Sequence, residues 1–90
     1  MREIIKRPIL TEKAKELAKL GQYTFEVEKD VTKSEIKRKI EETFGVEVEK
    51  VRIIKVPSKK RVFRGFLGEK KGYKKAIVKL KKGQKIEIFE

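Results

Sequence analysis

The sequence has 90 residues, enough for one domain, and its 26 Lys and Arg against 14 Asp and Glu give a net charge of +12. It has no cysteine and no histidine, which excludes disulfides, structural zinc fingers and thiol catalysis and removes the commonest general base. No segment is apolar enough for a signal peptide or a membrane span, so we expect a cytoplasmic protein that does not insert into membranes.

The first predicted helix covers residues 11–20. Thr11 is a suitable N-cap, apolar residues recur on one face with helical spacing, and Gly21 is a suitable stop. Pro8 should keep Arg7 extended and outside any helix.

A strand and a second helix are predicted next. Residues 22–28 alternate between apolar and polar types, as a half-buried strand does. Residues 32–44 form the clearest helix, because Thr32 and Glu35 fit a capping box and Gly45 supplies a C-terminal stop.

The second half of the sequence is rich in strand-forming residues. Residues 46–56 predict a strand with a slip or bulge near Glu49, residues 73–80 predict another, and 85–89 could form a short last strand. Between them, the segment 57–72 is too long for a tight turn. We interpret it as an extended basic loop, an arm that projects from a hairpin.

Together these elements predict one α+β domain over residues 1–90. Its antiparallel sheet has three to four strands and packs with two main helices, and the long basic hairpin arm extends from it. We expect the free protein to be monomeric.

The positive charge is concentrated in one third of the chain. Residues 1–54 hold 13 Lys and Arg against 11 Asp and Glu, and residues 83–90 hold one against two. Residues 55–82 hold 12 against one, a net of +11. Because each cation can neutralise a phosphate and release counterions, this segment predicts binding to nucleic acid.

Aromatic rings are interleaved with the cations of the arm, as in proteins that bind unstacked RNA bases. The alternative is a solvated loop whose rings fold back on the core, and for Tyr73 packing on a strand face explains the residue as well as stacking does. The candidate RNA-binding residues in and beside the arm are Lys55, Lys59, Lys60, Arg61, Phe63, Arg64, Phe66, Lys70, Lys71, Tyr73, Lys74 and Lys75.

Further candidate RNA contacts lie outside the arm. Lys33 and Lys37 stand beside the apolar stripe of the second helix, where a solvated face is the simpler explanation, and Arg7 precedes the first helix. The fragment Arg64–Phe66 resembles part of RNP1, but the residues that follow do not fit and the context is a loop, so we reject an RNA-recognition motif. No catalytic constellation, phosphate loop or metal-ligand spacing is present, so we expect no enzyme, metal or cofactor.

Three blocks, RPILTEK, TKSEIKRKIEETFGVEVEKV and YKKAIVKLKKG, closely resemble the bacterial large-subunit ribosomal protein L-twenty-three family. The resemblance covers nearly the whole chain, and the block from Lys74 to Leu80 is its most specific part. It implies an antiparallel sheet with helices, and a protein of the ribosome that binds large-subunit (23S) rRNA beside the polypeptide tunnel exit. Bacterial members carry a long hairpin loop where 57–72 stands, although the arm's own sequence matches less well. The richness in Lys and Glu fits a thermophile.

The resemblance also implies protein partners. Members of the family dock trigger factor and the signal recognition particle through a glutamate in a Ser/Thr-Glu-Lys element, which makes Glu12 and Lys13 candidate docking residues here. Ribosomal protein L-twenty-nine is the expected neighbour. From chemistry alone, Glu12 has only a favourable interaction with the helix dipole.

Two other functions stay open on the sequence. One is a small non-ribosomal protein that binds RNA or DNA without sequence preference, which co-sedimentation with large subunits in high salt would distinguish. The other is a peripheral membrane protein that uses a polybasic patch, against which the arm's lack of an amphipathic helix argues.

Overall fold

The computed structural model describes residues 3–57, 59–63, 66–70 and 72–87. It confirms the α+β class, both predicted helices and the strands predicted at 22–28, 46–56 and 73–80. The elements in chain order are β1 (Ile5–Pro8), α1 (Glu12–Ala18), β2 (Gln22–Val27), α2 (Lys33–Phe44), β3 (Val48–Val56), β4 (Lys59–Phe63), β5 (Phe66–Lys70) and β6 (Tyr73–Leu80).

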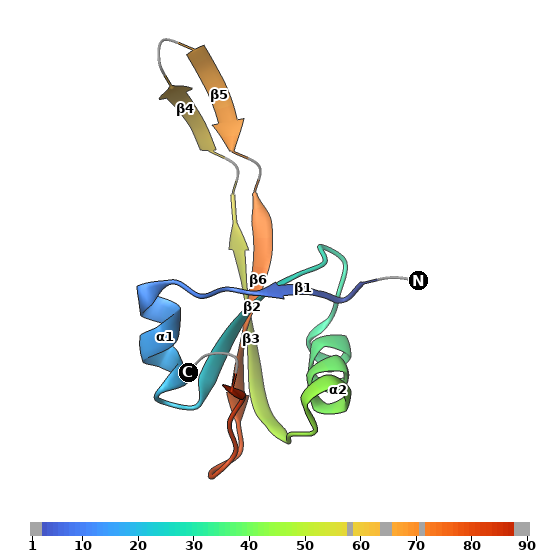
Figure 1. Cartoon of the computed structure of the whole chain (residues 1–90). Coiled ribbons are helices and arrows are strands. Elements are labelled where there is room, and N and C mark those ends of the chain that lie inside the picture. Colours follow the sequence, from blue (N-terminus) through green and yellow to red (C-terminus); the bar gives the residue numbers. More distant parts are fainter. Residues whose placement is uncertain (1–2, 58, 64–65, 71, 88–90) are drawn as a thin grey trace.

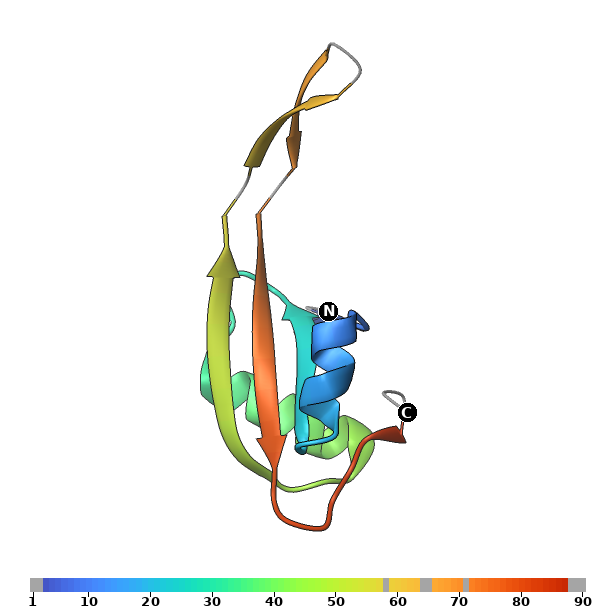
Figure 2. The same cartoon turned by 90° about the vertical axis from the view of Figure 1, so that its left-hand side faces the viewer.

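The body of the protein is a four-stranded antiparallel sheet between two helices. The strand order is β1-β2-β6-β3, so the last strand of the chain lies between the second and third. Helix α1 packs on one face of the sheet, over β2, and helix α2 packs on the other (Figures 1 and 2). We call these faces the α1 face and the α2 face.

The fourth strand of the sheet is β1, which lies near the N-terminus. The sequence had instead suggested a last strand at residues 85–89, and this prediction is wrong for residues 85–87, the part of that range that the structure describes. Pro8 lacks a backbone N–H, and an edge strand tolerates that loss. Residues 85–87 are not a strand, because the turn before them is tied back to the start of β3: the Gln84 Oε1 accepts a hydrogen bond from the Glu47 N–H. Residues 88 and 89 lie outside the described part of the chain.

Both helices begin at the predicted caps. The Thr11 hydroxyl accepts a hydrogen bond from the Ala14 N–H at 3.2 Å, and α1 then ends at Ala18, two residues short of the prediction. At the start of α2, the Thr32 hydroxyl accepts from the Glu35 N–H at 3.2 Å while the Glu35 carboxylate accepts from the Thr32 N–H at 3.0 Å. This confirms the predicted capping box, which fixes where α2 begins.

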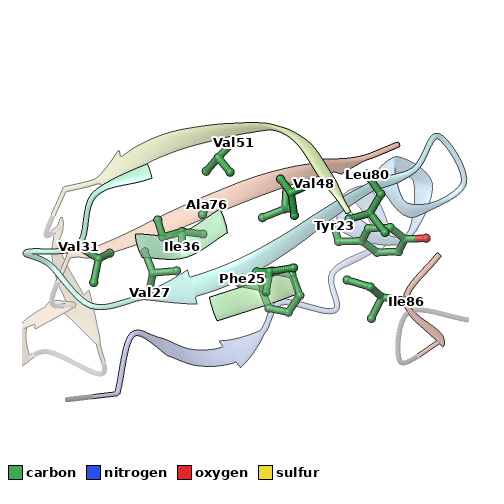
Figure 3. Close-up of a cluster of buried hydrophobic side chains, with 12 residues drawn as sticks. Tyr23, Phe25, Val27, Val31, Ile36, Val48, Val51, Ala76, Leu80 and Ile86 are labelled. Atoms are coloured by element: carbon green, nitrogen blue, oxygen red, sulfur yellow. The ribbon is translucent and has the colours of Figure 1, made fainter. Parts of the chain in front are cut away.

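The main core lies between the α2 face and α2. The Phe25 and Phe44 rings are 5.8 Å apart between their centroids. Ile86, from the irregular tail, closes one end of this core beside Tyr23 and Leu80 (Figure 3). The buried members of the cluster are Tyr23, Phe25, Val27, Val31, Ile36, Ile40, Val48, Val51, Ala76, Val78, Leu80 and Ile86.

Strand β2 is buried on its α2 face and partly exposed on the other at Gln22 and Glu26, as its alternation predicts, but the α1 face is also buried at Thr24. Thr24 points to the α1 face, yet it is only 3% exposed, because α1 packs over β2 there and buries Ala14 against it. The sequence pattern of one strand cannot reveal a short helix that covers its polar side.

Strands β3 and β6 continue towards a projecting two-stranded ribbon, which confirms the predicted hairpin arm (Figures 1 and 2). Val56 pairs with Tyr73 at the end of the main sheet. Beyond it, β4 and β5 pair antiparallel from Lys59 opposite Lys70 to Phe63 opposite Phe66. The segment that had shown little periodicity is therefore strand-paired over five residues on each side.

Candidate nucleic-acid interface

The residues of the arm that were predicted to contact RNA fall into two groups: some lie on the paired strands β4 and β5, and others lie outside the residues that the structure describes. The backbones of β4 and β5 carry Lys59, Lys60, Arg61, Phe63, Phe66 and Lys70, whose side chains lie outside the described part. Arg64 and Lys71 lie outside it entirely. Antiparallel pairing brings the two basic halves of the arm side by side, so their charge is concentrated on one narrow ribbon.

At the root of the arm, Lys74 and Lys55 are directly opposite each other on neighbouring strands. The Lys74 ammonium donates hydrogen bonds to the backbone carbonyl oxygens of Lys29 at 3.0 Å and Val31 at 3.1 Å. These carbonyls belong to the loop that leads into α2. Lys74 therefore fastens the arm root to that loop, a structural role that the sequence did not suggest, while Lys55 is exposed.

On the α1 face of the same strands, Tyr73 and Arg7 line one hollow between β1, the start of α1 and the arm root. The Arg7 Nε donates to the Glu26 carboxylate at 3.0 Å, and 75% of the Arg7 side chain is exposed. Because an exposed ion pair contributes little stability, it leaves the guanidinium available to a stronger anion. Tyr73 is half-buried, so both of its interpretations, packing and stacking, stay predictions.

Helix residues predicted as contacts are all on the surface. Lys33 and Lys37 are exposed on α2. Glu12 and Lys13 are exposed in the first turn of α1, and the Glu12 side chain is 94% exposed although its carboxylate lies 3.9 Å from the Lys15 ammonium. The candidate protein dock is therefore accessible, and the helix that carries it is separate from the strands of the arm root.

The sequence prediction missed two cations on the α1 face, Lys50 and Arg52. Lys50 and Arg52 on β3 and Lys79 on β6 are exposed there, around a shallow groove that Gln22 and Ile77 also line. The Arg52 Nη2 donates to the Gln22 Oε1 at 3.4 Å. Strict alternation along β3 and β6 was the signal that could have found these residues, because it sends every second side chain to one face.

Other kinds of site are not supported. Within the described ranges, no three His, Cys, Asp or Glu residues come together in a way that could hold a metal ion. None of the described helices is long and apolar enough to cross a bilayer.

Comparison with known proteins gives one consistent result. The model of the family "Ribosomal protein L23" matches residues 3–88. The large ribosomal subunit protein uL23 of Caldicellulosiruptor saccharolyticus is 53% identical over 90 residues, which cover 98% of this chain and 93% of that protein. The uL23 of Pelotomaculum thermopropionicum is 44% identical, with 99% and 94% covered, and that of Aquifex aeolicus is 51% identical, with 98% and 89% covered.

Proposed function

This chain belongs to the ribosomal protein L23 family, and from that we propose that it is a structural, non-catalytic constituent of the large ribosomal subunit. It binds large-subunit (23S) rRNA beside the polypeptide tunnel exit, in ribosomes of the cytoplasm. The relatives that support this are bacterial proteins, some from thermophiles, each named as a large-subunit protein.

The observation that carries RNA binding is the charged hairpin arm. Residues 55–82 carry a net charge of +11, and the structure arranges their middle part as a ribbon that stands out from the folded body (Figure 2). A projecting cationic ribbon can enter a space lined with phosphates, which a flat surface cannot. At its base, Arg7, Lys55 and Lys75 support the same contact with RNA, and Lys33 and Lys37 extend it over α2.

We test the arm by deleting residues 59–71. The deletion removes β4 and β5 and leaves three residues between the paired Val56 and Tyr73, a length that suits a hairpin loop. The body should fold as before, whereas affinity for a large-subunit rRNA transcript should fall and lose most of its salt dependence. RNA affinity that survives the deletion unchanged would show that the arm is not the main contact.

Glu12 and Lys13 are proposed to dock trigger factor and the signal recognition particle, and ribosomal protein L-twenty-nine is the proposed neighbour. The exposure of Glu12 at the start of α1 supports this, because a docking carboxylate must be reachable on the assembled subunit. Glu12→Ala should weaken the binding of trigger factor to ribosomes without changing subunit assembly. Glu16→Ala, an exposed position on the same helix, is the control, and equal binding by both variants would contradict the assignment.

A small nucleic-acid-binding protein outside the ribosome is the competing function. Sucrose-gradient sedimentation in high salt separates the two, since a subunit constituent stays with the large subunit there. Release of the protein from large subunits would favour the competing function.

A further inference from the structure

A large part of the α1 face has no helix over it. Helix α1 lies over β2, while β6 and β3 are uncovered on that side (Figure 2). We call this uncovered area the open sheet face. It consists of the outward side chains of Lys50, Arg52 and Ile54 on β3 and of Lys75, Ile77 and Lys79 on β6, with Gln22 at its border.

The strand register places like charges together on the open sheet face. Lys50 is directly opposite Lys79, and Lys75 is opposite Ile54, which is 37% exposed. Like charges directly opposite each other in a sheet are destabilising. The free protein therefore carries an arrangement that weakens its own sheet, and an anion on this face would remove that cost.

Carboxylates offset only part of the charge of this face. It holds the four cations Lys50, Arg52, Lys75 and Lys79, and the carboxylate that pairs with them is Glu49, 4.0 Å from Lys79. Glu26 lies opposite Lys75 on β2, but its carboxylate pairs with Arg7 at 3.0 Å. Among the described residues, the other three cations have no ion-pair partner.

Elsewhere on the described surface, the basic side chains are mixed: some have acidic partners, and others, such as Lys33 and Lys37, have none among the described residues. Lys6 pairs with Glu28 at 3.9 Å, and Lys81 pairs with Glu47 at 3.4 Å. On the open sheet face, four cations stand together on two neighbouring strands, and one carboxylate pairs with them. This local excess of positive charge fits a polyanion.

We propose that the open sheet face is a second rRNA-binding surface, which holds phosphates of the RNA backbone without reading its sequence. This rests on the proposed function and extends it to a surface other than the arm. The side chains there are ammonium and guanidinium groups around an aliphatic floor, Ile77, so they suit phosphate oxygens rather than base stacking. Arg52 can hold one phosphate through two N–H groups, while Lys50 and Lys79 act as point charges.

The open sheet face is continuous with the arm root. Lys79, Lys75 and Tyr73 follow each other on one side of β6, and β6 leads into the arm. At about 3.3 Å per residue, the distance from Lys79 to Tyr73 is about 20 Å. An RNA segment bound at the root can therefore continue along the sheet, and the two surfaces act as one extended site.

The test compares two matched double variants of the full chain. Lys50→Gln/Arg52→Gln removes two exposed cations from the open sheet face, and Arg38→Gln/Lys39→Gln removes two exposed cations from α2. Binding to a large-subunit rRNA transcript is measured over a series of salt concentrations with tRNA as competitor. The open-face variant should lower the slope of log affinity against log salt by about one for each phosphate that is no longer neutralised, about two in all. The α2 variant should keep the slope of the wild type.

Hydroxyl-radical footprinting supplies a second measurement. The open-face variant should lose protection of a set of rRNA positions that the deletion of 59–71 leaves protected. If the double variant unfolds, Lys50→Gln alone replaces it, since that change removes one member of the like-charged pair.

The possible failures are distinguishable. A wild-type protein that does not prefer the rRNA transcript over tRNA contradicts the proposed function itself. Specific wild-type binding that the open-face variant reproduces at every salt concentration, with an unchanged footprint, overturns the second surface alone. Normal RNA binding with loss of a neighbouring ribosomal protein from the variant's subunits also overturns it, and assigns the face to an acidic protein.

Discussion

The ammonium group of Lys74 lies 3.1 Å from the backbone carbonyl oxygen of Val31, and it donates a second hydrogen bond to the carbonyl of Lys29 at 3.0 Å. Lys75, the next residue, points to the opposite face and has no ion-pair partner in the described part of the chain. Two adjacent lysines in one basic strand therefore have different surroundings. One is bound to the fold, and the other is available to a ligand.

Exchanging these two lysines for glutamine should separate stability from RNA binding. Lys74→Gln should lower the free energy of unfolding by about 1 to 2 kcal/mol, because two carbonyls lose a charged donor at a partly exposed site. Lys75→Gln should leave the unfolding free energy within about 0.5 kcal/mol and weaken binding to rRNA. Urea unfolding and filter binding of both variants measure the two effects. Equal stability of the two variants would argue against the structural role of Lys74.

The pair formed by Lys50 and Lys79 should show measurable repulsion in the free protein. Lys50→Gln should raise the free energy of unfolding by a few tenths of a kcal/mol at low salt, and the gain should vanish near 1 M salt, where the Debye length is about 3 Å. Lys6→Gln is the control, since Lys6 faces the carboxylate of Glu28 and should gain nothing. A gain for Lys50→Gln that persists in high salt would mean that its cause is not electrostatic.

Thr24 carries a buried hydroxyl without a hydrogen-bond partner among the described residues. A buried polar group left unpaired costs about 1 to 3 kcal/mol. Thr24→Val, which keeps the branched shape, should therefore stabilise the protein by about 1 kcal/mol, measured as a higher melting temperature. Thr43→Val on the exposed side of α2 is the control and should change it little. A lower melting temperature for Thr24→Val would indicate that the hydroxyl is paired in solution.

Ile86 shows that the irregular tail contributes to the core. It is 3% exposed and packs beside Tyr23 and Leu80 at the end of the main cluster (Figure 3). Ile86→Ala should destabilise the protein by about 2 to 4 kcal/mol, through reduced apolar burial and the cavity that remains. Glu87→Ala, one residue further and exposed, should cost less than about 0.5 kcal/mol. Similar denaturant midpoints for both variants would mean that the tail is not held in the core.

Some features of the protein followed from local sequence. Both helices begin where Thr11 and Thr32 were expected to cap them, because a cap depends on a hydrogen bond that spans only three residues. The hairpin arm and the basic stretch could likewise be located, since charge and the sequence distance between two strands are properties of the chain itself. The sequence by itself thus determined the α+β class, the arm and the concentration of positive charge in residues 55–82.

Other features depended on contacts between distant segments. Residues 5–8 became a strand only because β2 offered an open edge, and Ile86 became buried without a strand because the core ended beside it. The sequence gives no reason to distinguish the lysines of β6 from one another, and only the tertiary structure shows which are bound to the fold and which are exposed. Pleating sends Lys74 to the α2 face, where loop carbonyls bind it, and Lys75 and Lys79 to the α1 face, where α1 lies over β2 and leaves β6 uncovered (Figure 2). Sequence patterns cannot decide this, because the burial and pairing of a side chain depend on what the rest of the chain packs against it.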